Sequence, residues 1–406
     1  MTTPTGPLAG VRIVDLTQML AGPFCTMLLA DQGAEIIKIE PIGGEYIRFG
    51  APFRPDDTMR VFTGYFASIN RNKKSIAIDL KKPEGRELVL RLCREADALV
   101  ENYRVGVMDR LGLSYETLRE VNPRLVYASI RGFGDPRTGR SPHVEWTAYD
   151  VVAQAMGGVM GINGAEAGRP LKVGPGIGDT VPGTMAAFGV VCAILQARQS
   201  GKGQYVDVAM VDAILSVCER IVAQYSVTGV VPRPEGNRHP MFAPFGMLPA
   251  KDGWITVAGH TDRLWGILCT QLDRPELITD PRSATREARV ENQAFVYDEI
   301  GRTTGAMTKH ELAARLGGRL PFGTVNDVED ILDDDHFRTR EMIVDVEHPG
   351  CAAPLQIAGN AIRMTETPGG VRSRAPMLGE HTDDILAGIG CSPEEIAALR
   401  QGQTVE

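Results

Sequence analysis

The sequence has no cysteine pattern of the kind that staples a small secreted domain or holds zinc. It contains seven cysteines, an odd number, and no two of them form a CxxC pair. Scattered cysteines of this kind are typical of reduced, mostly buried thiols in an intracellular protein. They stand at Cys25, Cys93, Cys192, Cys218, Cys269, Cys351 and Cys391.

Long apolar runs and a basic surface are missing as well. We find no run near the roughly 20 apolar residues that span a bilayer, and residues 1–10 lack the charged-then-apolar pattern of a signal peptide. We therefore expect a cytoplasmic protein without a membrane partner. The 43 basic and 51 acidic residues leave a net charge of -8, which offers no electrostatic footprint for a nucleic-acid partner.

Several catalytic and nucleotide-binding motifs are also absent. The first predicted strand is followed by residues 17–23 (TQMLAGP) and not by the G-x-G-x-x-G of a dinucleotide site, and no P-loop occurs. There is no H-E-x-x-H or G-x-S-x-G motif, and the seven histidines lack metal-ligand spacing. NAD, ATP, zinc and serine-hydrolase chemistry are therefore disfavoured, and we expect no metal or redox cofactor.

What the chain does have is the size and composition of a globular enzyme, with 406 residues, 43% hydrophobic and 23% charged. Strand and helix signals alternate through the first 135 residues. Repeated βαβ units of this kind predict an α/β fold, a Rossmann-like layer with a parallel sheet and helices on both faces. The predicted strands are 11–16, 34–40, 74–79, 98–101 and 125–131, and the predicted helices are 22–32, 83–96 and 115–121.

The rest of the chain predicts a second, smaller unit. A linker-like segment rich in Pro, Gly and Arg lies at 229–240, and Lys251-Asp252-Gly253 is a good hairpin turn between strands 245–249 and 254–258. We expect a large Rossmann-like domain over 1–225, a small α+β domain over 226–330 and a return to the large domain over 331–406. Further expected helices are 182–198, 211–224, 262–271, 286–302, 309–316 and one that begins at Ser392, and further strands are 204–209, 343–347 and 355–364.

Asp179 is the first candidate for chemistry. It follows the glycine-rich stretch 174–178 (GPGIG) and precedes the predicted helix 182–198. A carboxylate there would lie at a helix N-terminus, whose dipole and free N–H groups would keep it ionised. A simple N-cap role explains such a residue equally well, but the glycines would also let backbone N–H groups approach a ligand and form an oxyanion site.

A short basic cluster, Arg71, Lys73 and Lys74, leads into the predicted strand 74–79. A solvated surface run is the ordinary interpretation of such a cluster. A site for a phosphate-bearing ligand is the alternative, with Arg104 and Arg110 as further basic residues.

Taken together, several strings resemble the class III CoA-transferases of the formyl-CoA transferase or CaiB/BaiF type. Each string is weak alone, but their order and spacing extend from about residue 8 to about residue 400. The strings are GVRIVDLT at 10–17, LAGP at 20–23, DQGAEIIKIE at 31–40, NRNKKSI at 70–76, VENYR at 100–104, GFG at 132–134, AYD at 148–150, QAMGG at 154–158 and PMLGEHT at 376–382.

The resemblance implies a Rossmann-like large domain built from both ends of the chain, an inserted small domain and an interlocked homodimer. It implies an aspartate nucleophile at the position of Asp179. That carboxylate would attack an acyl-CoA to give a mixed anhydride, and CoA thiolate would then form an aspartyl-CoA thioester. Acyl-CoA and a carboxylic acid are the implied substrates, so coenzyme A takes part as a substrate and not as a cofactor. By position, the CoA site would include Gln18, Met19, Leu20, Ile78, Lys81, Asn102, Tyr103, Arg104, Arg110 and Tyr149.

Two departures from the oxalate-specific members bear on the substrate. Those members have an arginine after the residue matching Glu40 and a lysine at the position of Thr147, whereas this chain has Pro41 and threonine. They also carry a tetraglycine loop that is absent between residues 236 and 253. The chain is closer to the succinyl-CoA:dicarboxylate branch, and Arg48 is a candidate for gripping the distal carboxylate of such a substrate, although a surface arginine fits its position equally well.

Two other functions compete with acyl exchange. An α-methylacyl-CoA racemase of the same fold would need a histidine before Asp150, where this chain has Tyr149, so the acid–base pair for a 1,1-proton transfer is broken. A catalytically silent CoA-binding protein is the other alternative, and the retention of Asp179 among glycines argues against it.

Overall fold

The computed structural model describes residues 6–406, and its internal contacts divide the chain into two compact units. The first unit contains residues up to Val159, Val173–Val222 and Asp335–Glu406. The second unit contains Met160–Lys172 and Ala223–Asp334. The first unit therefore joins the two ends of the chain, and it holds the candidate nucleophile.

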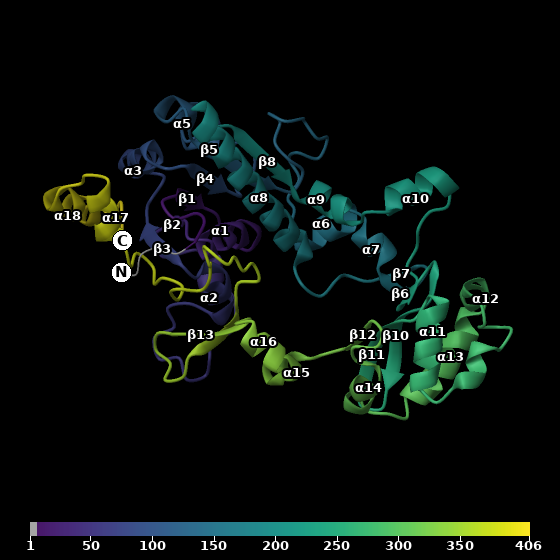
Figure 1. Cartoon of the computed structure of the whole chain (residues 1–406). Helices are drawn as coiled ribbons and strands as arrows, with labels where there is room; N and C mark the ends of the chain where they lie inside the picture. The colour runs from purple at the N-terminus through teal and green to yellow at the C-terminus, as the bar shows by residue number, and fades with distance from the viewer. Residues whose placement is uncertain (1–5) are drawn as a thin grey trace. The chain divides into compact units, whose positions relative to one another are not determined.

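The first unit is built on a six-stranded parallel sheet (Figure 1). The spatial order is β3-β2-β1-β4-β5-β8, and every neighbouring pair is parallel. This confirms the predicted α/β architecture, and the strand order reverses direction between β1 and β4. The strands are β1 (Arg12–Leu16), β2 (Glu35–Glu40), β3 (Lys73–Ala77), β4 (Ala98–Glu101), β5 (Val126–Arg131) and β8 (Tyr205–Ala209).

Helices cover both faces of this sheet because its strands are apolar on both sides. On one face, α1 (Ala21–Asp31) packs along α8 (Ile177–Ser200), and α8 also contacts β5 and β8 (Figure 1). On the other face, Leu88 and Leu92 of α3 (Pro83–Arg94), Leu118 of α5 (Tyr115–Val121) and Leu386 of α17 (Thr382–Gly388) share a core with the strands.

Shorter elements complete the first unit, and its C-terminal end returns to the sheet, where Val405 forms a bridge with Ile78. Ser392 caps the last helix as predicted, because its side chain accepts the Glu395 N–H. The remaining elements are η1 (Tyr46–Arg48), α2 (Gly64–Asn70), α4 (Val107–Arg110), α6 (Asp150–Met156), α9 (Met210–Val217), α16 (Asp335–Thr339), β13 (Ile343–Val346), β14 (Leu355–Ala358) and α18 (Pro393–Gln401). Two helices, α7 (Val159–Ile162) and α10 (Ile221–Thr228), begin in the first unit and have most of their residues in the second.

The second unit has its own core, in which Trp265, Val296 and Leu312 are buried between an antiparallel sheet and helices. The predicted hairpin is present, and two predicted helices, 211–224 and 286–302, are each broken into two. The elements of this unit are β6 (Gly164–Glu166), β7 (Arg169–Pro170), β9 (Arg238–His239), β10 (Phe242–Ala250), β11 (Gly253–Ala258), α11 (Asp262–Gln271), η2 (Pro275–Ile278), α12 (Arg286–Glu291), α13 (Gln293–Thr304), α14 (Lys309–Leu316), β12 (Phe322–Thr324) and α15 (Val328–Asp333).

Helix α8 corrects two expectations. It begins at Ile177, so Asp179 lies inside the first turn and not ahead of the helix. It is also 24 residues long and apolar enough, by length and composition, to cross a membrane. The same helix packs against α1 and the sheet, which is how a core helix of a globular unit behaves.

The basic cluster 71–74 is neither a solvated run nor a phosphate site. Arg71 is buried on Asp31 at 2.7 Å, and Lys73 is buried with its Nζ 3.1 Å from a carboxylate oxygen of Asp15. Lys74 pairs with Glu35 at 2.6 Å. Arg71 and Lys73 are paired because a charge removed from water needs a partner. The Lys74 side chain is 36% exposed, so its pair with Glu35 is a surface ion pair.

Arg48 is also a structural residue and not a ligand for a substrate carboxylate. Its side chain is fully buried, donates to both carboxylate oxygens of Glu40 at 2.6 and 2.7 Å, and donates to the Pro376 carbonyl at 3.0 Å. Ser75 donates to the same carboxylate. The sequence-based interpretation of Arg48 as a substrate contact or a surface residue is therefore wrong.

We predict that Arg48→Met lowers the free energy of unfolding by about 3–5 kcal/mol, because it leaves the Glu40 carboxylate buried without its cation. Circular dichroism in a urea titration measures the loss. Arg94→Met is the matched control, because Arg94 forms an exposed ion pair with Glu87 and its loss should change the midpoint little. An Arg48→Met protein of unchanged stability with a raised KM for a dicarboxylate would contradict this assignment.

Candidate active site

The candidate active site forms where β1 and β4 end side by side. In open parallel sheets, ligands bind beyond the carboxyl ends of the strands, at the point where the strand order reverses. Here that point is bridged by one side chain: Asn102 Oδ1 accepts the Gln18 N–H at 2.9 Å, and Asn102 Nδ2 donates to the Gln18 carbonyl at 2.7 Å. The turns after β1 and β4 are thereby fixed to each other.

A cavity of about 330 Å³ opens beside this bridge and holds Asp179. It brings together eight of the residues that the sequence selected. They are Gln18, Met19, Asn102, Tyr103, Arg104, Arg110, Tyr149 and Asp179.

Besides Arg48, three other selected residues do not line this cavity. Ile78 is buried in the sheet core, and Lys81 is exposed beyond β3. Leu20 precedes α1 and lies against the segment before Asp179, because a Cβ built on Gly176 would stand 3.0 Å from Leu20 Cδ2. Leu20 therefore supports the wall of the cavity, whereas the structure gives Ile78 and Lys81 no such place.

Asp179 lies in the first turn of α8. The preceding residue, Gly178, allows this turn to lie close to the start of α6. Gly178 donates its N–H to Asp150 Oδ1 at 2.8 Å, and a Cβ at Gly178 would stand 2.4 Å from the Asp150 carbonyl oxygen. Only glycine therefore allows the start of α8 to lie this close to the start of α6.

The electrostatics of Asp179 differ from the sequence-based expectation. Burial, and next the charge of Asp150, raise the pKa of Asp179 to about 7. No side-chain hydrogen bond stabilises its charged form among residues 6–406. The start of the helix therefore does not keep this carboxylate fully ionised, and Asp179 is a poorly solvated carboxylate of raised basicity.

A buried ion pair shapes the loop after β4. Burial raises the pKa of Glu101 to about 7, although Arg131 at the end of β5 lies 2.6 Å from it and counters the shift. Glu101 accepts the Tyr103 N–H at 2.7 Å, and Arg131 donates to the Tyr103 carbonyl at 3.1 Å. The pair thus fixes the loop 102–104 that lines the cavity.

Sequence reasoning missed three aromatic residues here. Trp146 is 57% exposed and lines the cavity together with Phe133, whose ring lies 6.1 Å from it, edge to face. Tyr65 of α2 lies near Asp179: burial, and next the charges of Asp179 and Asp150, raise the pKa of Tyr65. Phe133 lies in the GFG string at 132–134, which was a signal for it, whereas Tyr65 and Trp146 belong to none of those strings. Trp146 is one of only three tryptophans in the chain, and that rarity was the available signal.

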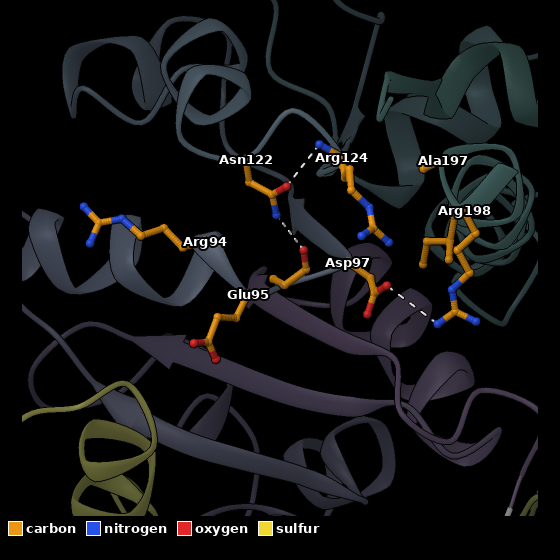
Figure 2. Close-up of a pocket in the computed structure, with 9 residues that line it drawn as sticks. Arg94, Glu95, Asp97, Asn122, Arg124, Ala197 and Arg198 are labelled. Carbon is orange, nitrogen blue, oxygen red and sulfur yellow. Dashed lines mark hydrogen bonds and ion pairs between the residues drawn. The ribbon is translucent and has the colours of Figure 1, made fainter. Parts of the chain in front are cut away.

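A second cavity, of about 290 Å³, lies at the opposite edge of the sheet (Figure 2). Asp97 precedes β4 and Arg124 precedes β5, so this cavity lies at the amino ends of the strands. Figure 2 shows Arg198 directed at Asp97, with an N···O separation of 3.6 Å. Its position and its internal ion pair make it a poor candidate for chemistry compared with the cavity that holds Asp179.

Comparison with known proteins identifies the family of the chain. A family model described as CoA-transferase family III matches residues 8–382. The succinyl-CoA:mesaconate CoA-transferase of Haloarcula hispanica is 44% identical over 393 residues, which cover 96% of this chain and 99% of that protein. The succinyl-CoA–D-citramalate CoA-transferase of Chloroflexus aurantiacus is 36% identical over 99% of each chain.

A solved structure shares the fold as well. The crystal structure of a CaiB/BaiF family protein from Brucella suis has a TM-score of 0.85 and 35% identity, over 95% of this chain and 100% of that one. The family match covers both sides of the cavity, from Gln18 to Asp179. The chain therefore belongs to CoA-transferase family III, and it is an enzyme of the transferase class.

Proposed function

We propose that this enzyme moves CoA from succinyl-CoA to a short dicarboxylate through a covalent intermediate on Asp179. The observation that carries the proposal is the position of Asp179, which lies in a cavity at the sheet's switch point and carries a carboxylate of raised basicity. The substrate class is supported by relatives named as succinyl-CoA:mesaconate and succinate–glutarate CoA-transferases, the latter 36% identical.

The chemistry is an exchange of two acyl bonds. The Asp179 carboxylate attacks the thioester carbonyl, the C–S bond breaks, and CoA leaves as the thiolate. The thiolate then attacks the aspartyl carbonyl of the mixed anhydride, which forms an aspartyl-CoA thioester and releases succinate. The acceptor carboxylate next repeats both steps in reverse, so no net proton or electron is needed.

The tetrahedral intermediates of these steps need hydrogen-bond donors for an oxyanion. Ala21, in the first turn of α1, lines the same cavity as Asp179. The first N–H groups of a helix have no acceptor within the helix. In α1 these are the N–H groups of Ala21 and Gly22, because Pro23 has no N–H and Phe24 donates to the Leu20 carbonyl. We assign the start of α1 as the source of donors, and the cavity residues Asn102, Tyr103, Arg104 and Arg110 as contacts for CoA.

We predict that Asp179→Ala abolishes CoA exchange, by at least about a thousandfold, because the covalent route has lost its nucleophile. Asp179→Glu should be severely impaired too, since one methylene misplaces the attacking oxygen. Mass spectrometry of products from succinyl-CoA, acetyl-CoA and formyl-CoA with a panel of mono- and dicarboxylates measures the exchange. The matched control is Asp212→Asn, an exposed carboxylate of α9, which should exchange like the wild type.

Unchanged exchange in Asp179→Ala would contradict the mechanism. If the wild type exchanged no acyl group, α-proton exchange of branched acyl-CoAs in deuterated water would instead support the racemase. That alternative has weak support here, because no histidine lines the cavity among the described residues and Tyr149 stands where the base would be.

The pH dependence follows from the raised pKa of Asp179. The nucleophile acts deprotonated, so kcat/KM should rise with pH through about 7 and level off above it. Asp150→Asn removes a neighbouring negative charge while its amide oxygen can still accept the Gly178 N–H, so the rise should move to lower pH.

In Asp150→Asn, the pKa of Asp179 should fall by only part of the amount by which the fold raises it, because burial is the larger cause of that rise. The measurement is kcat/KM against pH for wild type, Asp150→Asn and the control Asp212→Asn. A profile for Asp150→Asn that coincides with the wild type would show that Asp150 does not influence the nucleophile.

We also propose that the enzyme acts as an interlocked homodimer. Helix α8 exposes a row of apolar side chains at helical spacing, with Phe188 73% and Leu195 59% exposed and Val191 between them. A continuous apolar row on a globular unit is typical of an interface. This row supports a second copy of the chain as the partner that covers it.

We predict that Phe188→Glu/Leu195→Glu shifts the protein from dimer to monomer, because the interface would have to bury two carboxylates. Size-exclusion chromatography with light scattering measures the mass. Gln196→Glu adds one charge at an exposed position outside this row of the same helix and should leave the mass unchanged. A monomeric wild type would contradict the homodimer.

A further inference from the structure

The turn between β1 and α1 adopts a backbone conformation that needs an external restraint. Met19 has φ of 66°, in the left-handed region that a residue with a Cβ rarely occupies. Gln18 and Met19 both line the cavity that holds Asp179. The turn is therefore a strained segment in direct contact with the candidate active site.

Glu45 supplies the restraint from a different part of the chain. Its Oε2 accepts the Met19 N–H at 2.9 Å, and its Oε1 lies 2.7 Å from Lys38 Nζ. Lys38 Nζ also donates to the Thr17 carbonyl at 2.9 Å. The side chains of Glu45 and Lys38 are 2% and 0% exposed, so this network is screened from water.

Each of the two peptides in the turn is held by two side chains: Lys38 and Asn102 hold the Thr17–Gln18 peptide, and Asn102 and Glu45 hold the Gln18–Met19 peptide. Lys38 holds the Thr17 carbonyl, Asn102 holds both polar groups of Gln18, and Glu45 holds the Met19 N–H. The start of α1, with its free N–H groups, follows directly. Asn102 holds the carbonyl side of the Gln18–Met19 peptide, and Glu45 holds its N–H side, which faces the start of α1.

We propose that Glu45 is a positioning residue for the transfer reaction: paired with Lys38, it fixes the Met19 peptide and so holds the wall formed by Gln18, Met19 and the start of α1 at the reaction centre. This inference rests on the proposed function. Glu45 touches no substrate and acts only through the backbone of the turn.

A purely stabilising role does not explain the arrangement as well. A buried ion pair is often no more stabilising than a well-packed apolar pair of the same size, because both ions lose their hydration. The distinctive contribution of Glu45 is an acceptor oxygen aimed at one backbone N–H of a strained turn. The test must therefore separate that acceptor from the charge.

Two double variants make this separation: Lys38→Met/Glu45→Gln and Lys38→Met/Glu45→Met. Both remove the two buried charges and keep the side-chain length, but only glutamine offers an oxygen to Met19. We expect the glutamine version to keep kcat within about threefold of the wild type and the methionine version to lose about 10- to 100-fold, as a displaced reacting geometry does. The KM for acyl-CoA should stay within about threefold in both.

Two further readouts accompany the kinetics. The two double variants should have similar Tm values, because both lack the two buried charges and their side chains at position 45 are similar in length. Hydrogen exchange followed by mass spectrometry should show faster exchange of the Met19 amide in the methionine version only, and this readout does not depend on activity.

The outcomes separate the two proposals. Equal kcat values and equal exchange at Met19 in the two double variants would overturn the role of Glu45. A wild type without any CoA exchange would instead contradict the proposed function. If the double variants do not fold, the single variants Glu45→Gln and Glu45→Met give the same comparison of acceptor against no acceptor, with the same two overturning results.

Discussion

The first unit is organised by the need to pair charges that lie inside its parallel sheet. Asp15, Lys38, Glu40 and Lys73 belong to three adjacent strands, and all four are at most 3% exposed. An unpaired charge at such a position would cost several kcal/mol, so each must meet a partner. The strands satisfy only some of these needs among themselves, as Lys73 does with Asp15.

The remaining partners of these buried charges come from the segment after β2, at the edge of the sheet where the candidate site lies. Glu45 reaches Lys38, and Arg48, three residues later, reaches Glu40. Because both residues stand in one short segment, pairing them fixes that segment beside the carboxyl ends of β1 and β2. The pairing with Lys38 also places the second carboxylate oxygen of Glu45 within hydrogen-bond distance of the Met19 N–H. The residue that neutralises a buried charge therefore also restrains the turn that lines the cavity.

The regular elements could be predicted from the sequence, whereas the partners of its charged residues could not. Apolar runs such as 98–101 and helix signals such as Ser392 are local, and the structure confirms both. Arg71 pairs with Asp31, 40 positions away, and Arg48 donates to a carbonyl 328 positions away, so nothing in their neighbourhoods indicated burial. Asp179 could be selected from its glycines and from the family resemblance, but its raised pKa depends on burial and on Asp150, which only the fold brings close.

Burial makes Asp179 a better base and also a less ionised one, and the site must reconcile these effects. With a pKa of about 7, the carboxylate is poorly solvated but still substantially deprotonated near neutral pH. A fully hydrogen-bonded carboxylate would be ionised at lower pH, yet it would have to give up those bonds in order to attack a thioester. In this structure the side-chain hydrogen bonds are made to the backbone around Asp179 and not to its carboxylate. Asp150 holds the Gly178 N–H, Asn102 holds Gln18, and Glu45 holds Met19. These contacts hold the backbone around Asp179, while its carboxylate accepts no side-chain hydrogen bond from residues 6–406, and the covalent exchange proposed above requires this arrangement.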